Sequence, residues 1–191
     1  MTILKPKDFI KSVLVDEVDS MIEKHPYISF IIMGIGIEFL GKCIDTSLND
    51  WNVPGRSKRD FEKAINDIPS LQKYSTYLST FDLYGSFRCG LAHAVSPKYK
   101  ITLSSKDEMG HLVQGTGRLN LKVEDFYADF KSAGEYVISL SFTAGDKMEG
   151  DFLHVPGTEF NSGTEIKSGA TSSLEPPTGA TSSSSSSGAT S

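Results

Sequence analysis

Arg88 and His93 stand out in this chain as residues whose types and spacing suit a reaction. They lie in the segment Tyr84-Gly-Ser-Phe-Arg-Cys-Gly-Leu-Ala-His93, near the end of a predicted amphipathic helix. Cleavage of an RNA phosphodiester needs a group that moves a proton to or from the 2′-oxygen or the leaving 5′-oxygen, and histidine does this near neutral pH. It also needs a fixed cation over the phosphate, and arginine binds phosphate oxygens bidentately. The pair therefore has the chemistry of a metal-independent ribonuclease site.

The five-residue step from Arg88 to His93 has a geometric consequence. On an ideal α-helix it separates the two side chains by about 140°, so they do not share one face of a single helix. Two arrangements would bring them together. One is a dimer cleft built from two such helices, and the other is a helix that is loosened at Gly90.

Each candidate residue also has a structural interpretation. His93 is either a catalytic or RNA-contacting group or a histidine that interacts with the last carbonyls of its helix. Arg88 either binds phosphate or pairs with Glu38, because an acid within an apolar helix needs a partner. Glu38 is also four residues from Lys42 and could pair with it. Tyr84, one turn before Arg88, either belongs to the core or an interface or lines the site.

These residues require a helical scaffold, and the hydrophobic periodicity predicts a mainly α bundle of about five helices. Ser57 with Asp60 resembles a capping box, and Pro69 ends the short helix that follows. Alternating apolar residues around 99–103 and 119–123 predict a small β-hairpin or three short strands before the last helix. The other predicted helices cover 6–24, 27–44, 70–94 with a break near 79–80, and 124–142.

Composition divides the chain into three parts. Residues 1–143 are predicted to form the helical domain, and 144–167 a polar extension. Residues 168–191 are nearly all Ser, Gly, Ala, Thr and Pro, with Gly-Ala-Thr repeated. Such a segment buries too little apolar surface to offset the entropy of ordering, so we expect a disordered tail.

The net charge of −5 argues against broad coating of nucleic acid but leaves room for a local RNA site. Cys43 and Cys89 form no disulfide framework of the kind found in small secreted domains. The N-terminus lacks an apolar signal core, so a cytoplasmic location is expected. The apolar stretch 27–40 contains Glu38 and is shorter than the roughly 20 residues of a membrane span, so no membrane contact is expected.

No metal or other cofactor is predicted. His25, His111 and His154 have no metal-ligand spacing with one another or with either cysteine. No glycine-rich loop follows a strand and opens a helix, as a phosphate-binding loop would.

The arrangement of motifs resembles the HEPN superfamily, over roughly residues 6–142. Arg88-x4-His93 in a helical bundle is similar to the R-x4-6-H signature of that superfamily. The apolar helix with Ile37-Glu38-Phe39-Leu40-Gly41 and the late helix that starts Val123-Glu124-Asp125-Phe126 agree with it. Two features depart from the pattern. Cys89 stands where active members often carry a polar residue, and the hairpin is an addition to a plain bundle.

The resemblance implies a metal-independent endoribonuclease that works as a homodimer. His93 would be the general acid or base, Arg88 would stabilise the developing phosphorane charge, and Glu38 or Tyr84 would orient them. It also implies an RNA substrate, a role in defence or stress as a toxin-like nuclease, and a neutralising antitoxin protein. The alternative is a non-catalytic HEPN-like module that binds a protein or a nucleotide, which the acidic charge and Cys89 favour.

Overall fold

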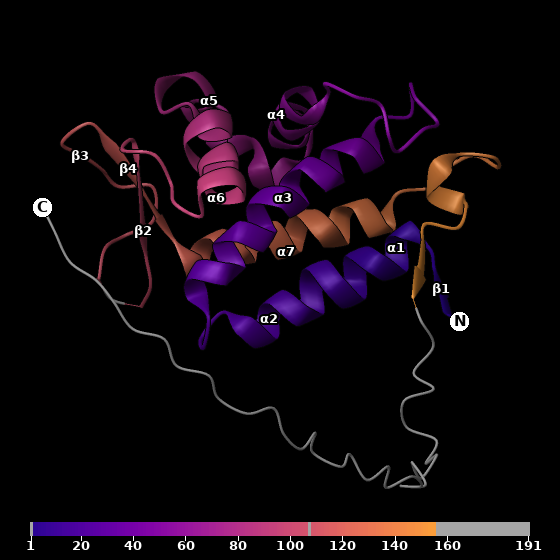
Figure 1. Ribbon diagram of the computed structural model, residues 1–191, viewed down its shortest axis with the longest axis horizontal. Helices are drawn as coiled ribbons and strands as arrows, with labels where there is room; N and C mark the ends of the chain where they lie inside the picture. The colour runs from indigo at the N-terminus through magenta and orange to yellow at the C-terminus, as the bar shows by residue number, and fades with distance from the viewer. Residues whose placement is uncertain (1, 107, 156–191) are drawn as a thin grey trace, which may run out of the picture. The chain divides into compact units, whose positions relative to one another are not determined.

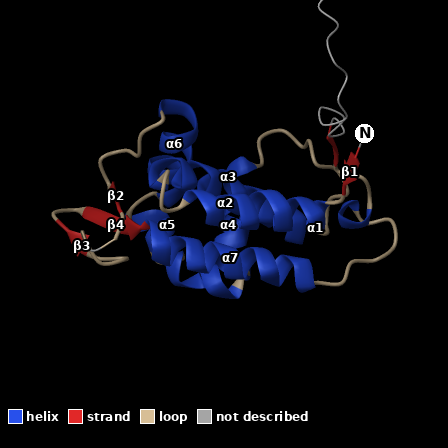
Figure 2. Ribbon diagram, turned by 90° about the horizontal axis from the view of Figure 1, so that it is seen from below, coloured by secondary structure: helices blue, strands red, loops and turns tan. Residues whose placement is uncertain are grey.

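The computed structural model describes residues 2–106 and 108–155, and it is mainly helical with a small three-stranded sheet, as the sequence predicts (Figures 1 and 2). Helix α3, Pro26–Ile44, contacts most of the other helices. It is apolar on nearly every side, which is typical of the central helix of a bundle. Its length and composition alone would suit a membrane span. However, 56% of its most apolar 18-residue window is buried inside the protein.

The N-terminal helix matches the predicted one closely. It comprises α1, Pro6–Phe9, the π-helical segment η1, Ile10–Glu17, and α2, Val18–Met21. Pro6 occupies the first helical position, where its missing N–H has no cost. The strand β1, Thr2–Leu4, precedes it.

The helix predicted over 70–94, with a break near 79–80, is divided further, into a series of short pieces. These are η2, Pro69–Tyr74, α5, Tyr77–Thr80, the π-helical η3, Leu83–Arg88, and α6, Cys89–Ala94. The main break falls at Asp82, slightly after the predicted position, because Asp82 adopts a left-handed conformation with φ 50°. Its carboxylate accepts a hydrogen bond from the Gly85 N–H, which stabilises the start of η3.

The predicted β-region forms a sheet with strand order β2-β4-β3 at one end of the bundle (Figures 1 and 2). β2, Ile101–Ser104, runs parallel to β4, Arg118–Lys122, while β3, Gln114–Gly115, pairs with β4 as an antiparallel hairpin. The inner face of the sheet packs on the core. Helix α7, Val123–Ser139, follows β4 directly and ends slightly earlier than predicted.

The folded part of the chain extends past the predicted boundary at residue 143. η4, Lys147–Glu149, and β5, Leu153–Val155, follow, and β5 pairs with β1. The reason is a half-buried aromatic cluster formed by Phe152 with Phe9, Phe39 and Trp51. The predicted disordered tail, 168–191, and the second half of the predicted polar extension, 156–167, lie outside the described residues.

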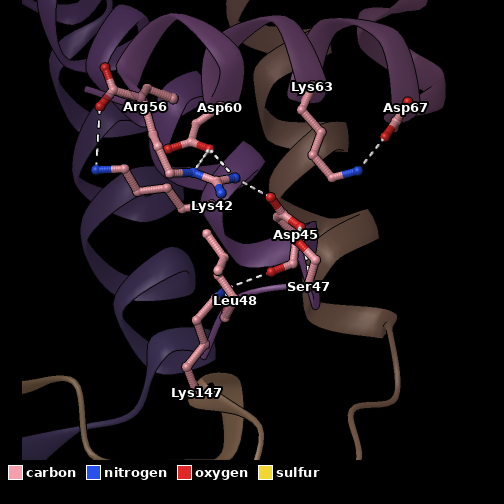
Figure 3. A network of polar contacts seen from close by, with 10 residues as sticks. Lys42, Asp45, Ser47, Leu48, Arg56, Asp60, Lys63, Asp67 and Lys147 are labelled. Atoms are coloured by element: carbon pink, nitrogen blue, oxygen red, sulfur yellow. Dashed lines mark hydrogen bonds and ion pairs between the residues drawn. The ribbon is translucent and has the colours of Figure 1, made fainter. Parts of the chain in front are cut away.

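Arg56 joins the end of α3 to the start of α4, Ser57–Asp67 (Figure 3). Its guanidinium pairs with Asp45 and, at 3.1 Å, with Asp60. The predicted capping box of Ser57 and Asp60 is therefore absent, because the buried Asp60 carboxylate receives Arg56 instead. Burial alone would raise the pKa of Asp45, but hydrogen bonds from Ser47 and Arg56 lower it from 3.8 to about 2.

Lys147 adds a second connection to the same place (Figure 3). Its ammonium group donates to the backbone carbonyls of Asp45 and Leu48 at 2.6 and 2.5 Å. Asp45 is the C-cap of α3, where a positive charge is favourable to the helix dipole, and Leu48 lies in the loop that follows. η4 is thereby held against the end of the central helix.

Gly41 is where α3 and α4 come closest, and it yields a stability prediction. A methyl group at this position would overlap the backbone carbonyl of Asp60. We expect Gly41→Ala to lower the free energy of unfolding by about 3 kcal/mol or more, because backbone atoms must separate. Urea denaturation measures this.

The matched control is Gly115→Ala, where an added methyl group meets nothing within 4 Å. That variant should stay within about 0.5 kcal/mol of the parent protein. Equal stability of the two variants would show that the helices do not approach each other at Gly41.

Candidate functional site

The segment that carries Arg88 and His93 is built from two kinds of helix. η3 has wide turns, and the N–H of Cys89 bonds to the carbonyl of Tyr84, five residues earlier. From Cys89 the chain continues as α-helix through Gly90, so the wide turns include Arg88 and end before Gly90. π-helical turns are rare and are often found at functional sites.

The end of α6 is also unusual. Val95 has φ 51°, a left-handed conformation that costs energy for a β-branched residue. The Tyr27 hydroxyl donates to the Val95 carbonyl at 2.6 Å, and the Ser96 N–H bonds to the Gly90 carbonyl. A methyl group on Gly90 would lie 2.7 Å from the Ser96 carbonyl oxygen. These contacts fix the end of the helix just after His93.

Arg88 points toward α3 and forms an ion pair with Glu38, with 2.5 Å between Nη2 and Oε2. Both side chains are largely buried, at 12% and 7% exposed. The contact is an ion pair and not a well-aligned hydrogen bond, and Arg88 Nε has no hydrogen-bond partner among the described residues. Lys42 approaches the other Glu38 oxygen at 3.4 Å. One carboxylate therefore contacts two cations.

Tyr84 lies beside this pair. The guanidinium of Arg88 is 5.8 Å from the centre of the Tyr84 ring, a cation–π arrangement, and the same ring packs against Phe61. Burial and the neighbouring Cys89 raise the pKa of Tyr84, so its hydroxyl stays protonated near neutral pH. The structure thus brings together three of the four predicted residues: Arg88, Glu38 and Tyr84.

His93 lies apart from these three. Its side chain is exposed near the C-terminal end of α6, and it makes no hydrogen bond or ion pair with the other described residues. Arg88 faces α3 within one chain while His93 faces solvent. Within one chain, therefore, the two side chains do not meet.

A polar cluster that the sequence did not suggest lies between η2, α7 and the sheet. The Tyr74 hydroxyl is 2.7 Å from His111 Nε2 and donates to Asp129 at 2.5 Å. His111 Nδ1 accepts the Lys122 backbone N–H, so the ring proton is on Nε2. Burial lowers the pKa of His111 despite the nearby Asp129. The sequence does not predict this contact, because 37 residues separate Tyr74 from His111 and no local pattern relates them.

No group of three or more His, Cys, Asp or Glu side chains that could hold a metal occurs within 2–106 and 108–155. Comparison of the chain with models of protein families, with curated proteins and with solved structures gives no match. A function is therefore inferred from the geometry of this chain alone.

The Arg88–Glu38 pair yields a second prediction. We expect Arg88→Ala and Glu38→Ala each to lower the free energy of unfolding by about 3–5 kcal/mol, because each leaves a buried charge without its main partner. The double variant should cost less than the sum, which chemical denaturation of all four proteins measures.

Lys42→Ala is the control, since Lys42 is more exposed and farther from Glu38. Its loss should cost about 1 kcal/mol or less. Additive effects of the Arg88 and Glu38 substitutions would show that the two side chains do not interact.

Proposed function

We propose that the protein is a HEPN-like, metal-independent endoribonuclease that acts as a homodimer. The observation that carries this proposal is an exposed imidazole, His93, in the same helical segment as an arginine that Glu38 and Tyr84 hold in one orientation. An acid–base group must be accessible to substrate, while the phosphate-binding cation must be fixed. The two residues meet these different requirements.

In the proposed reaction the 2′-oxygen of RNA attacks the adjacent phosphorus, and the 5′-oxygen of the next nucleotide leaves. One proton is removed from the 2′-hydroxyl and one is delivered to the leaving oxygen. Two His93 side chains, one from each protomer, supply these two transfers. Arg88 stabilises the charge that develops on the phosphoryl oxygens. Neither step needs a metal ion.

The exposed surface of α3 supports a dimer next to this segment. Ile28 and Ile35 are 44% and 45% exposed, and Ile31 is half-buried between them. Residues at these spacings share one helix face. At about 100° per residue, this apolar face lies next to the side on which Gly34 and Glu38 contact the Arg88 segment. Pairing two copies through it would bring both α6 helices to a common cleft.

A second candidate function is a non-catalytic HEPN-like module that binds a protein or a nucleotide. The observation that favours it is the Arg88–Glu38 pair itself, because the carboxylate already neutralises the guanidinium. A phosphate would have to compete with Glu38 for Arg88. In this case His93 would contact a partner and take no part in proton transfer.

The resemblance to the HEPN superfamily also suggests a biological setting, which we include in the proposal. It places the protein in the cytoplasm, in defence or stress response, as a toxin-like nuclease that a separate antitoxin protein neutralises. Single-stranded RNA is the proposed substrate.

Cleavage of single-stranded RNA in excess EDTA tests the proposed chemistry. We expect the purified protein to cut, and His93→Ala to reduce the rate by at least about 100-fold, the smaller end of what acid–base catalysis contributes. The control is His25→Ala, which removes another exposed imidazole and should leave the rate unchanged. Cutting that survives His93→Ala would assign the chemistry to other residues. RNA binding without cutting would favour the second candidate.

The dimer is tested by placing a charge on the apolar face. Ile35→Asp should convert a dimer to a monomer in sedimentation velocity and abolish RNA cleavage, because a buried carboxylate at the interface is costly. Tyr136→Asp, on the exposed side of α7, is the control and should leave both unchanged. A monomeric parent protein that still cuts RNA would exclude the composite site.

A further inference from the structure

A pocket of about 320 Å³ lies on the outer face of the three-stranded sheet, away from Arg88 and His93. Residues of this face alternate with those of the core face. Leu119 and Leu121 are buried on the inner side, whereas Arg118 and Asn120 lie on the outer side. The volume is within the range of small-ligand sites. The pocket is lined by Thr102, Met109, Val113, Gly115, Thr116, Arg118 and Asn120.

Asn120 lines this pocket and carries a buried acceptor without a partner among the described residues. Its side chain is buried, with the residue 1% exposed, and Nδ2 donates to the Ser104 hydroxyl at 2.7 Å and to the Gly110 carbonyl at 2.9 Å. A carbonyl can only accept, so the amide cannot be reversed. Oδ1 has no hydrogen-bond partner among the described residues. An unpaired buried acceptor costs free energy, and a ligand N–H would satisfy it.

Arg118 supplies one positive charge. It is exposed, follows the same outer face two residues before Asn120, and makes no ion pair with other described residues. Lys122, the next residue along this face, is 3.7 Å from Asp125 and is partly neutralised. Among the described residues that line the pocket, Arg118 is the one cation, and a single positive charge matches one carboxylate better than a doubly charged phosphate.

The remaining walls are apolar. Met109 and Val113 are 46% and 47% exposed, so their apolar surface is available to cover a bound apolar group. The unbranched Met109 side chain is the kind that adapts its shape to a ligand. A ligand for this pocket thus combines an apolar side chain, an N–H and a carboxylate.

We infer that this pocket binds an N-acylated apolar amino acid, either as a free molecule or as the C-terminal residue of a peptide. The carboxylate pairs with Arg118, the amide N–H donates to Asn120 Oδ1, and the apolar side chain lies between Met109 and Val113. The inference is independent of the proposed ribonuclease activity, because no residue of the Arg88 segment takes part.

Titration calorimetry of the full chain with N-acetyl-leucine tests the inference. Binding should weaken about tenfold for N-acetyl-leucinamide, which lacks the carboxylate, since hydrogen bonds to charged groups contribute at least that factor. N-acetylglycine lacks the apolar side chain and should also bind about tenfold more weakly. A pentapeptide that ends in leucine, with a free or an amidated C-terminus, shows whether the natural ligand is a peptide.

Two variants connect binding to this pocket. Gly115 lines the pocket opposite Arg118 in the β3–β4 pairing, and a Cβ added there meets no atom within 4 Å, so Gly115→Leu should extend into the pocket with the melting temperature unchanged. It should abolish binding, and Arg118→Ala should weaken it about tenfold. Arg59→Ala, on the exposed side of α4, is the charge-matched control.

Loss of binding in Gly115→Leu and weakening in Arg118→Ala, but not in Arg59→Ala, supports the site. The inference is overturned if neither N-acetyl-leucine nor the peptide binds, or if both variants bind as the parent does. It is also overturned if adenosine monophosphate binds and N-acetyl-leucine does not. None of these results depends on RNA cleavage, so the two proposals can fail separately.

Discussion

The close approach of the α3 and α4 backbones at Gly41 constrains the orientation of the central helix. It fixes the rotation of α3 about its own axis, so Glu38 faces the Arg88 segment while Ile28 and Ile35 remain exposed. Arg56 and Lys147 then hold the C-terminal end of the same helix. Both the candidate catalytic residues and the proposed dimer face follow from this one orientation.

Charged groups inside an apolar bundle decide orientation more than stability. A buried ion pair contributes little net free energy, since desolvation offsets attraction, but removing one partner is costly. Glu38, Asp45 and Asp60 each receive a cation, so each fixes the direction of a side chain from another element or from the next helix. Asn120 departs from this pattern through its unpaired Oδ1, and for that reason it points to a ligand.

Helical periodicity and proline positions predict most of the fold, because both act within a few residues. The sequence also places Glu38, Arg88 and Tyr84 near one another, since a buried acid needs a partner. It does not reveal the break at Asp82 or the contact of Tyr74 with His111. The first depends on a single left-handed residue, and the second on packing between distant segments. The aromatic cluster around Phe152, which extends the domain past residue 143, is likewise visible only in three dimensions.

The pairing of β1 with β5 joins the two ends of the described chain, with Leu4 opposite Leu153. β1 precedes all the described helices in the chain and β5 follows them, so β1 is synthesised before its partner strand. Until β5 has been synthesised, the edge of β1 that pairs with it has its backbone groups bonded to water. The β1–β5 pairing therefore cannot form until the segment after α7 has been made, whereas the contacts among the helices need only the chain up to α7.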